Sequence, residues 1–213
     1  MVKEISSSIK DETLIQKRRA QLQKGAVTLF KDKGFHRATT REIAKAAGFS
    51  IGTLYEYIRT KEDVLFLVCD AIYDEVKSRM DAVIDTNETS EDALYQAVKS
   101  YFHVMDDLQD EVLILYQELK ALPKEAQDYV LNKEIEMMHL FEQILTNNYA
   151  SVLSDQDIVL MANNIFIQGQ MWGFRRWTLQ KTFTLEDYTN LQFKWLTNQL
   201  SYEAYNQKQG GVS

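Results

Sequence analysis

The residues best suited to chemistry in this chain are the basic side chains near its N-terminus. Residues 1–61 contain 13 Lys and Arg against 6 Asp and Glu, a balance of +7, whereas the rest has 11 against 25, a balance of −14. Together they give the net charge of −7. A basic segment on an acidic remainder is typical of a module that meets phosphates at one end. The alternative is an acidic protein with an incidental basic patch.

The stretch from Thr39 to Lys61 has the pattern of two short helices joined by a tight turn. Thr39 is suited to cap the first helix, and Glu42 three residues later completes a capping box. Gly48 stands where that helix should end, because glycine adopts the left-handed backbone at little steric cost. Ser50 can cap the second helix. This pattern indicates a helix-turn-helix, whose second helix lies in the DNA major groove.

Helical patterns continue along the whole chain, without a strand pattern or a repeat. The first helix is expected over residues 12–33, ended by Gly34, and a helix capped by Thr60 is expected to run to about residue 84. A later helix is expected to start at Ser90 and to carry apolar residues as far as Met105, and further helices are expected over about 109–122, 124–147, 154–180 and 184–205. A single proline and few glycines favour long helices. The sequence therefore predicts an all-α fold: a three-helix DNA-binding head over 1–61 and a helical body over 62–213.

Several classes of protein are disfavoured by the sequence. It has no run of 18 apolar residues, so no membrane association is expected, and its N-terminus lacks the apolar core of a signal peptide. Cys69 is the only cysteine, which fits a cytoplasmic location. The three histidines are scattered, and no nucleophile–base arrangement or phosphate-binding glycine loop is evident. We therefore expect neither enzyme activity, nor a metal site, nor a cofactor.

Methionine and aromatic residues in the expected body could form an adaptable apolar pocket. At each single position ordinary core packing is the alternative. Arg175 could hold a carboxylate or phosphate if it borders the pocket, and the alternative is a surface ion pair. The residues predicted to bind a ligand are Tyr101, Phe102, Met105, Tyr116, Met138, Phe141, Phe166, Gln170, Trp172 and Arg175.

Residues 18–66 resemble the DNA-binding region of the tetracycline-repressor (TetR/AcrR) family of transcriptional regulators. The resemblance is carried by the runs Thr39–Ala44 and Gly52–Tyr55, and by the run Lys61–Leu65, together with Ala26, Leu29, Phe30, Gly34, Phe35, Ala47 and Gly48. It implies a homodimer whose two heads read a palindromic operator. It also implies that a small effector bound in the body changes the spacing of the heads and releases the DNA.

The resemblance implies a phosphate contact for Tyr55 in the second helix of the motif and for Lys61 at the start of the next helix. Glu56 departs from the family pattern, in which a basic or aromatic residue is common. Because the recognition helix lacks Arg, Asn and Gln, part of the readout is expected to come from DNA shape, or from Arg41 and Lys45 on the preceding helix. The residues predicted to meet DNA are Arg37, Thr39, Thr40, Arg41, Ser50, Ile51, Gly52, Thr53, Tyr55, Glu56 and Lys61.

The expected function is therefore that of a ligand-responsive transcriptional regulator, a homodimeric repressor released by an apolar or amphipathic effector such as a fatty acyl-coenzyme A. The alternatives are a drug-sensing regulator of an efflux pump and a helical lipid-binding protein without a DNA function. The family resemblance places the dimer contact on the last two helices. Their apolar stripes are Ile158, Met161 and Ile165 on one helix, and Leu191, Trp195, Leu196, Leu200 and Tyr202 on the other.

Overall fold

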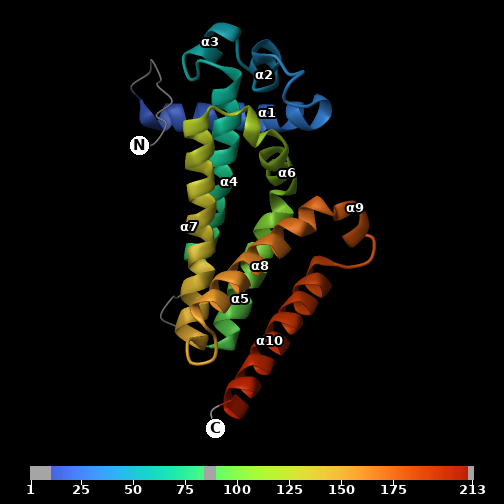
Figure 1. The fold of residues 1–213 in the computed structure, drawn as a ribbon. Coiled ribbons are helices and arrows are strands. Elements are labelled where there is room, and N and C mark those ends of the chain that lie inside the picture. Colours follow the sequence, from blue (N-terminus) through green and yellow to red (C-terminus); the bar gives the residue numbers. More distant parts are fainter. Residues whose placement is uncertain (1–10, 84–89, 211–213) are drawn as a thin grey trace. The chain divides into compact units, whose positions relative to one another are not determined.

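The computed structural model describes residues 11–83 and 90–210, with side chains through Tyr202, and within these residues the chain forms helices and no strands (Figure 1). The predicted all-α class is therefore confirmed. The helices are α1 (Glu12–Lys33), α2 (Thr40–Ala46), α3 (Ile51–Tyr55), α4 (Lys61–Val83), α5 (Glu91–Asp107), α6 (Gln109–Glu118), α7 (Lys124–Tyr149), α8 (Asp155–Phe174), α9 (Arg176–Leu179) and α10 (Leu185–Gly210), with a 3₁₀ turn, η1, at Leu119–Ala121. Among the described helices, none is long and apolar enough to cross a membrane.

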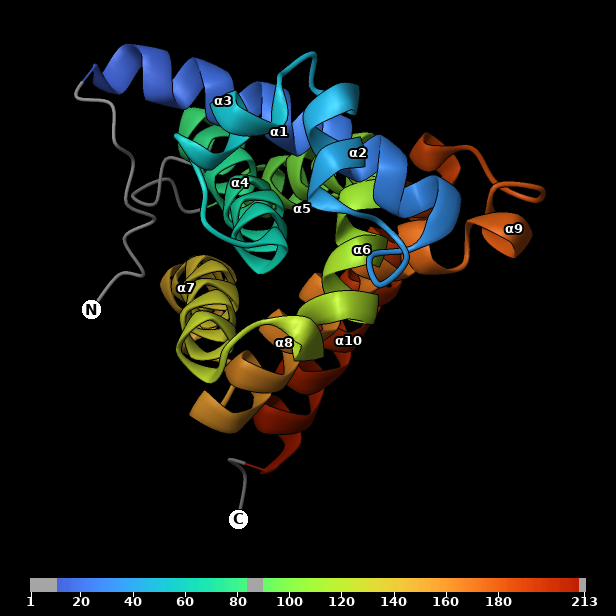
Figure 2. The same ribbon diagram turned by 90° about the horizontal axis from the view of Figure 1, so that it is seen from above.

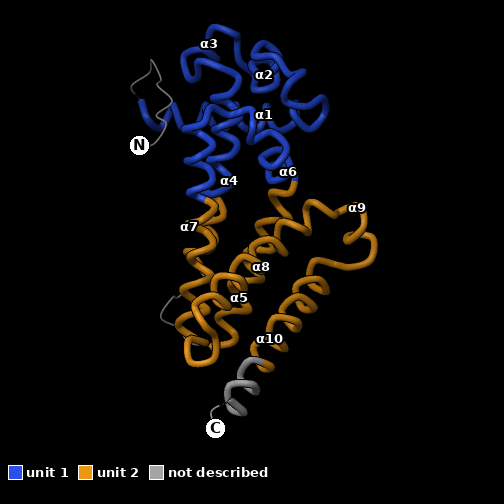
Figure 3. Tube along the Cα trace, viewed as in Figure 1, with its two compact units in different colours: residues 1–74, 110–133 blue, residues 75–109, 134–213 orange. Residues whose placement is uncertain are grey.

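The chain divides into two compact units (Figure 3). The first unit comprises residues 1–74 and 110–133, and the second comprises residues 75–109 and 134–213. Helices α4, α6 and α7 each contribute residues to both units. The predicted functional division after Lys61 is a different one, and it stays a prediction.

The three N-terminal helices pack closely within the first unit, where α2 lies against α1 (Figures 1 and 2). Gly25 permits this approach, because a Cβ there would lie 2.8 Å from the main-chain nitrogen of Ala47. The small core between these helices is fully buried and is formed by Leu22, Ala26, Phe30, Phe35, Ile43 and Leu54. Burying a side chain of the size of Leu or Phe stabilises a fold by about 1.5–3 kcal/mol, so these few residues hold the head together.

Helix α4 begins with the predicted cap. The amide of Asp63 donates to Thr60 Oγ1 at 3.2 Å, and the amide of Thr60 donates back to Asp63 Oδ2 at 3.0 Å. Farther along the helix, Tyr129 of α7 donates to Asp70 Oδ1 at 2.9 Å, within the same unit. Burial raises the pKa of Asp70 and the Tyr129 hydrogen bond opposes that shift. The first unit therefore combines the head with the adjoining parts of α4 and α7.

Several predicted helix boundaries were wrong. The helix expected over residues 109–122 ends at Glu118, and η1 follows it. The helix expected to run from residue 154 to 180 ends at Phe174, and a separate short helix, α9, follows Arg175. Arg175 has φ −109° and ψ 21°, outside the helical range, although its neighbours Phe174 and Trp177 continue an apolar helical pattern. The last helix is longer than expected and reaches Gly210. Helix α1, in contrast, has the predicted bounds and the predicted end at Gly34.

Candidate nucleic-acid interface and effector site

The turn between α2 and α3 and the caps of both helices are formed by the residues predicted for them. Thr39 and Glu42 form the capping box of α2, and the amide of Thr53 donates to Ser50 Oγ at 3.0 Å at the start of α3. Gly48 has φ 76°, the left-handed conformation that the tight turn requires. The helix-turn-helix is thus present in the structure with its expected caps.

Helix α3 has one buried side chain, and its other residues are exposed or half-buried. Leu54 is fully buried and anchors the helix on the head, which fixes the opposite face as the exposed one. Tyr55 is 52% exposed, and its hydroxyl oxygen lies 3.2 Å from Thr40 Oγ1 at the start of α2. Ser50, Gly52 and Glu56 are also exposed, and Ile51 and Thr53 are half-buried. The predicted DNA-binding residues of α3 therefore share one accessible surface, closed at one edge by the contact between Tyr55 and Thr40.

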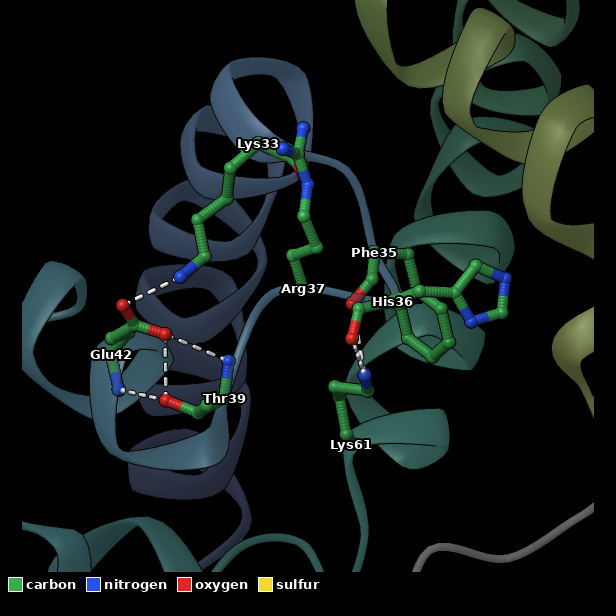
Figure 4. A network of polar contacts seen from close by, with 7 residues as sticks. All are labelled: Lys33, Phe35, His36, Arg37, Thr39, Glu42 and Lys61. Carbon is green, nitrogen blue, oxygen red and sulfur yellow. Dashed lines mark hydrogen bonds and ion pairs between the residues drawn. The ribbon is translucent and has the colours of Figure 1, made fainter.

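Several basic side chains of the head are already held by the protein (Figure 4). Lys33 donates to Glu42 Oε1 at 2.6 Å, and Arg37 Nε donates to the carbonyl of Lys33 at 2.6 Å. The hydrogen bond from Lys33, followed by those from the Thr39 side chain and main chain, lowers the pKa of Glu42 from 4.5 to about 2. Glu42 therefore stays ionised and carries a matching cation beside it, which limits its repulsion of a nearby phosphate.

Lys61 makes contacts that the sequence did not indicate. Its Nζ donates to the carbonyl of Phe35 at 2.9 Å and to that of His36 at 3.3 Å, and lies 4.2 Å from the centre of the Phe35 ring (Figure 4). An ammonium group has three N–H donors, so one donor is left for a phosphate. Lys61 thus anchors the loop after α1, and its phosphate contact stays a prediction.

Arg41 and Lys45 differ from these held cations. Both lie on α2 and are exposed, and no ion pair is observed for either of them among the described residues. Long basic side chains in this state can reach phosphates or base edges without breaking an internal contact. They are therefore cations of α2 that are available to bind DNA.

Helix α6 supplies acidic partners to the head within the first unit. Lys31 Nζ lies 2.5 Å from Asp110 Oδ2, and His36 Nε2 lies 3.4 Å from Glu118 Oε2. Neither pair was predicted, because the partners are about eighty residues apart in the sequence. Both pairs join the end of α1 and its following loop to α6.

In the second unit, five of the ten residues predicted to bind a ligand belong to one aromatic cluster. Tyr101 is 1% exposed, stacks on Phe166 with ring centres 5.4 Å apart, and meets Phe141 edge-on at 5.4 Å. Its hydroxyl donates to the carbonyl of Phe166 at 3.1 Å. Gly169 makes this packing possible, because a Cβ there would lie 2.9 Å from Tyr101 Cδ1 and closer still to Cε1. Phe102, Met105, Gln170 and Trp172 are also buried in this unit.

Three predicted ligand residues lie apart from this buried set. Tyr116 belongs to the first unit and is 41% exposed. Met138 is half-buried on α7, and Arg175 is exposed, with its guanidinium carbon 6.0 Å from the centre of the Trp177 ring. The structure therefore gives Arg175 a surface position in place of one inside the cluster.

Two residues of this region were missed by sequence reasoning. Tyr188 is 3% exposed and its ring centre lies 5.1 Å from that of Trp172, while Asp106 Oδ1 accepts from Trp172 Nε1 at 2.6 Å. The helical spacing of Leu185, Tyr188, Gln192 and Leu196 carries the signal for an inward face. The dimer contact expected on the last helix includes neither Tyr188 nor Gln192, so the sequence did not predict this inward face.

The apolar stripe predicted on α8 for dimer formation was wrong. Ile158, Met161 and Ile165 are 1–6% exposed, so they belong to the core of this chain and cannot meet a partner. On α10, Leu196 and Leu200 are likewise buried, whereas Trp195 and Tyr202 are 60% and 62% exposed. The exposed apolar residues of α8 are Val159, Leu160 and Ile167.

Known proteins resemble the chain both in its head and over most of its length. Residues 22–68 match the family model described as "Bacterial regulatory proteins, tetR family". The regulator HbdR of Aromatoleum sp. is 24% identical over 86% of this chain and 81% of its own length. The repressor KstR2 of Mycolicibacterium smegmatis is 29% identical over 75% of this chain and 78% of its own length.

A solved structure, of AibR in complex with isovaleryl coenzyme A and operator DNA, has a TM-score of 0.68. It is 18% identical and covers 83% of this chain and 96% of AibR, so it shows a shared fold. The family match lies on the three helices whose caps, turn and exposed face are described above. Residues 22–68 of this chain thus carry a domain of the tetR family of bacterial regulatory proteins.

Proposed function

We propose that this chain is a ligand-responsive, DNA-binding transcriptional regulator that acts as a homodimeric repressor and leaves a palindromic operator when it binds a small apolar or amphipathic effector. The observation that carries the proposal is the helix-turn-helix of the matched segment, in which the burial of Leu54 turns the remaining face of α3 to solvent. KstR2 of Mycolicibacterium smegmatis, a similar protein, is named as a transcriptional repressor.

The DNA-binding surface we propose consists of the exposed side of α3, the start of α2 and the basic residues beside them. Helix N-termini at Thr40 and Ser50 offer main-chain N–H groups and a positive dipole end to phosphates. Arg41 and Lys45 add cations that make no ion pair within the described residues. Binding should fall steeply with salt, since neutralising each phosphate releases condensed counterions. The proposed contact residues are Arg37, Thr39, Thr40, Arg41, Ser50, Ile51, Gly52, Thr53, Tyr55, Glu56 and Lys61.

We propose that the effector binds in the second unit, at the aromatic cluster around Tyr101, Phe166 and Trp172. Rings that stack or meet edge-on favour an apolar or planar ligand. An acyl-coenzyme A remains one option, because AibR, which shares the fold, was solved with isovaleryl coenzyme A. Arg175 on the surface could hold the phosphate-bearing end of such a ligand. A drug-like effector with control of an efflux pump is the second option.

The proposed homodimer uses the exposed apolar residues of α8 and α10. Leu160, Trp195 and Tyr202 are each about 60% exposed. Large apolar side chains exposed in a patch are typical of a contact with another protein. Helix α8 also has a hollow of about 370 Å³ beside Leu160, and it is lined by Asp155, Gln156, Val159, Leu160 and Asn163. These residues replace the buried stripe that the sequence suggested.

The direct test is an electrophoretic mobility shift with DNA from upstream of the gene that encodes this chain, at low salt. We expect a shifted band that disappears on addition of effector. Arg41→Ala should weaken the shift, and Lys181→Ala, which removes an exposed cation from the second unit, serves as the matched control. No shift with any genomic fragment would favour a helical lipid-binding protein without a DNA function.

A further inference from the structure

Gln192 is an unusual residue in the interior of the second unit. It lies on α10, one turn from Tyr188 and one turn from Leu196, and only 5% of its surface is exposed. A buried amide normally satisfies both its N–H groups and its oxygen, because an unpaired buried polar atom costs free energy. The partners of Gln192 are therefore informative.

The orientation of the Gln192 amide is set by Tyr188. The Tyr188 hydroxyl donates its one proton to the carbonyl of Gln168 at 2.7 Å, so its oxygen can only accept from Gln192. The Gln192 Nε2 group supplies that hydrogen bond, and reversing the amide would place two acceptors against each other. The Gln192 Oε1 atom consequently points away from Tyr188, and no donor from the described residues lies within hydrogen-bond distance of it.

Tyr188, the residue that binds the Gln192 amide, lies among aromatic rings. The Tyr188 ring lies 5.1 Å from that of Trp172 and 5.6 Å from that of Phe102, centre to centre. The polar hydrogens nearby are already used: Trp172 Nε1 donates to Asp106, and Tyr188 donates to Gln168. A ligand group that meets Gln192 Oε1 therefore has to bring its own proton.

We propose that Gln192 Oε1 is the polar anchor of the effector site and accepts a hydrogen bond from a hydroxyl group on a planar, otherwise apolar effector. This inference rests on the proposed effector site and narrows the class of ligand. An ionised carboxylate has only acceptor oxygens, so it would be repelled by Gln192 Oε1 and is disfavoured there. The planar part of the effector is held by the rings of Phe102, Trp172 and Tyr188.

Three probes of nearly the same shape test the proposal: 2-naphthol, which carries a donor, naphthalene, which carries none, and 2-naphthoate, which carries only acceptors. Their affinities for the wild-type chain are measured by titration calorimetry. We expect 2-naphthol to bind about tenfold more tightly than naphthalene, the size of effect expected from one buried hydrogen bond, and more tightly than 2-naphthoate.

The variant Gln192→Met keeps the length of the side chain and removes the acceptor. Its affinities for 2-naphthol and naphthalene should agree within about twofold, a difference smaller than one buried hydrogen bond would produce. Gln199→Met, at an exposed position of the same helix, is the matched control and should keep the tenfold preference. Circular dichroism checks that the variants are folded. If Gln192→Met does not fold, Gln192→Leu takes its place. If neither variant folds, the affinities of the wild type for the three probes decide the test.

Three results would overturn the proposal: 2-naphthoate binding as tightly as 2-naphthol, a preference for 2-naphthol that survives in Gln192→Met, or no binding of any probe by the wild type. The second result would mean that a group other than Gln192 accepts the hydrogen bond from 2-naphthol. A mobility shift on the same preparation separates this inference from the proposed function. If the wild type shifts DNA while the probe results fail, only the Gln192 proposal falls, and if it shifts no DNA, the regulator itself is in question.

Discussion

The ammonium group of Lys61 donates to the main-chain carbonyl of Phe35 at 2.9 Å and thereby ties the start of α4 to the loop that follows α1. The same group lies 4.2 Å from the centre of the Phe35 ring, which is itself fully buried in the head. Because one ammonium group makes both a cation–π contact and a charge-assisted hydrogen bond, it stabilises the conformation of this loop. Lys61 is therefore a structural residue of the head in addition to a predicted phosphate contact.

Replacing Lys61 should lower the stability of the head, whether or not Lys61 also contacts DNA. We expect Lys61→Met, which keeps the apolar stem, to lower the free energy of unfolding by about 1–2 kcal/mol through loss of the charge-assisted hydrogen bonds. Urea denaturation followed by circular dichroism measures the change. If Lys61 also contacts a phosphate, the slope of log affinity against log salt becomes less negative by about 1. An unfolding midpoint equal to that of the wild type would contradict the anchoring role.

The capping box of α2 predicts a dependence of stability on acid pH. The pKa of Glu42 is about 2 in the folded chain against 4.5 for the free group, so its ionised form is favoured by folding. This contribution is fully present above pH 4.5 and is lost as the pH falls through 2. Denaturation of Glu42→Gln should show a flatter loss of stability between pH 4.5 and 2 than the wild type. Identical pH profiles for the two proteins would argue against the capping box.

Gly169 should tolerate no side chain. In Gly169→Ala the added methyl group would overlap the Tyr101 ring, and overpacking of this kind costs about 1–3 kcal/mol. Gly52→Ala is the contrasting variant, because the nearest atom to its added Cβ is Ser50 Oγ at 3.7 Å. Thermal unfolding should show a large loss of stability for Gly169→Ala and little or none for Gly52→Ala. Equal midpoints for the two would mean that the Tyr101 packing is misplaced.

The proposed dimer predicts that charge on α10 prevents self-association. Trp195→Glu introduces a carboxylate at a 60% exposed aromatic position and should shift the protein from dimer to monomer in sedimentation velocity. Trp177→Glu, at a 58% exposed position on α9, is the control and should leave the dimer intact. A dimer that survives Trp195→Glu would exclude this face of α10 as the contact.

The helices of the head were predictable because their signals are local. Thr39, Glu42, Gly48 and Ser50 act on main-chain groups within a few residues, so their types and spacing determine the caps and the turn. The end of α8 at Arg175 was not predictable, since the residues around it keep a helical apolar pattern. Propensity alone rarely decides such a boundary.

The candidate site was less predictable than the fold, because its contacts join distant parts of the chain. Lys61 and Phe35 are 26 residues apart, and His36 meets Glu118 across a much longer separation. Which face of α8 is buried also depends on the helices that pack against α8. The apolar stripe with Ile158 was therefore predicted to contact a second copy of the chain, but it lies in the core of its own chain. One sequence shows which residues are apolar, but it does not show whether they face their own core or a second copy.

The central claim is that the exposed face of α3, with the start of α2, binds DNA. The measurement that tests it most directly is the affinity for a fluorescent operator fragment, by anisotropy over a range of salt concentrations, for the wild type, Arg41→Ala and Lys181→Ala. The account predicts that Arg41→Ala weakens binding and makes the salt slope less negative by about 1, whereas Lys181→Ala leaves both unchanged. Equal affinities and slopes for all three proteins would contradict it.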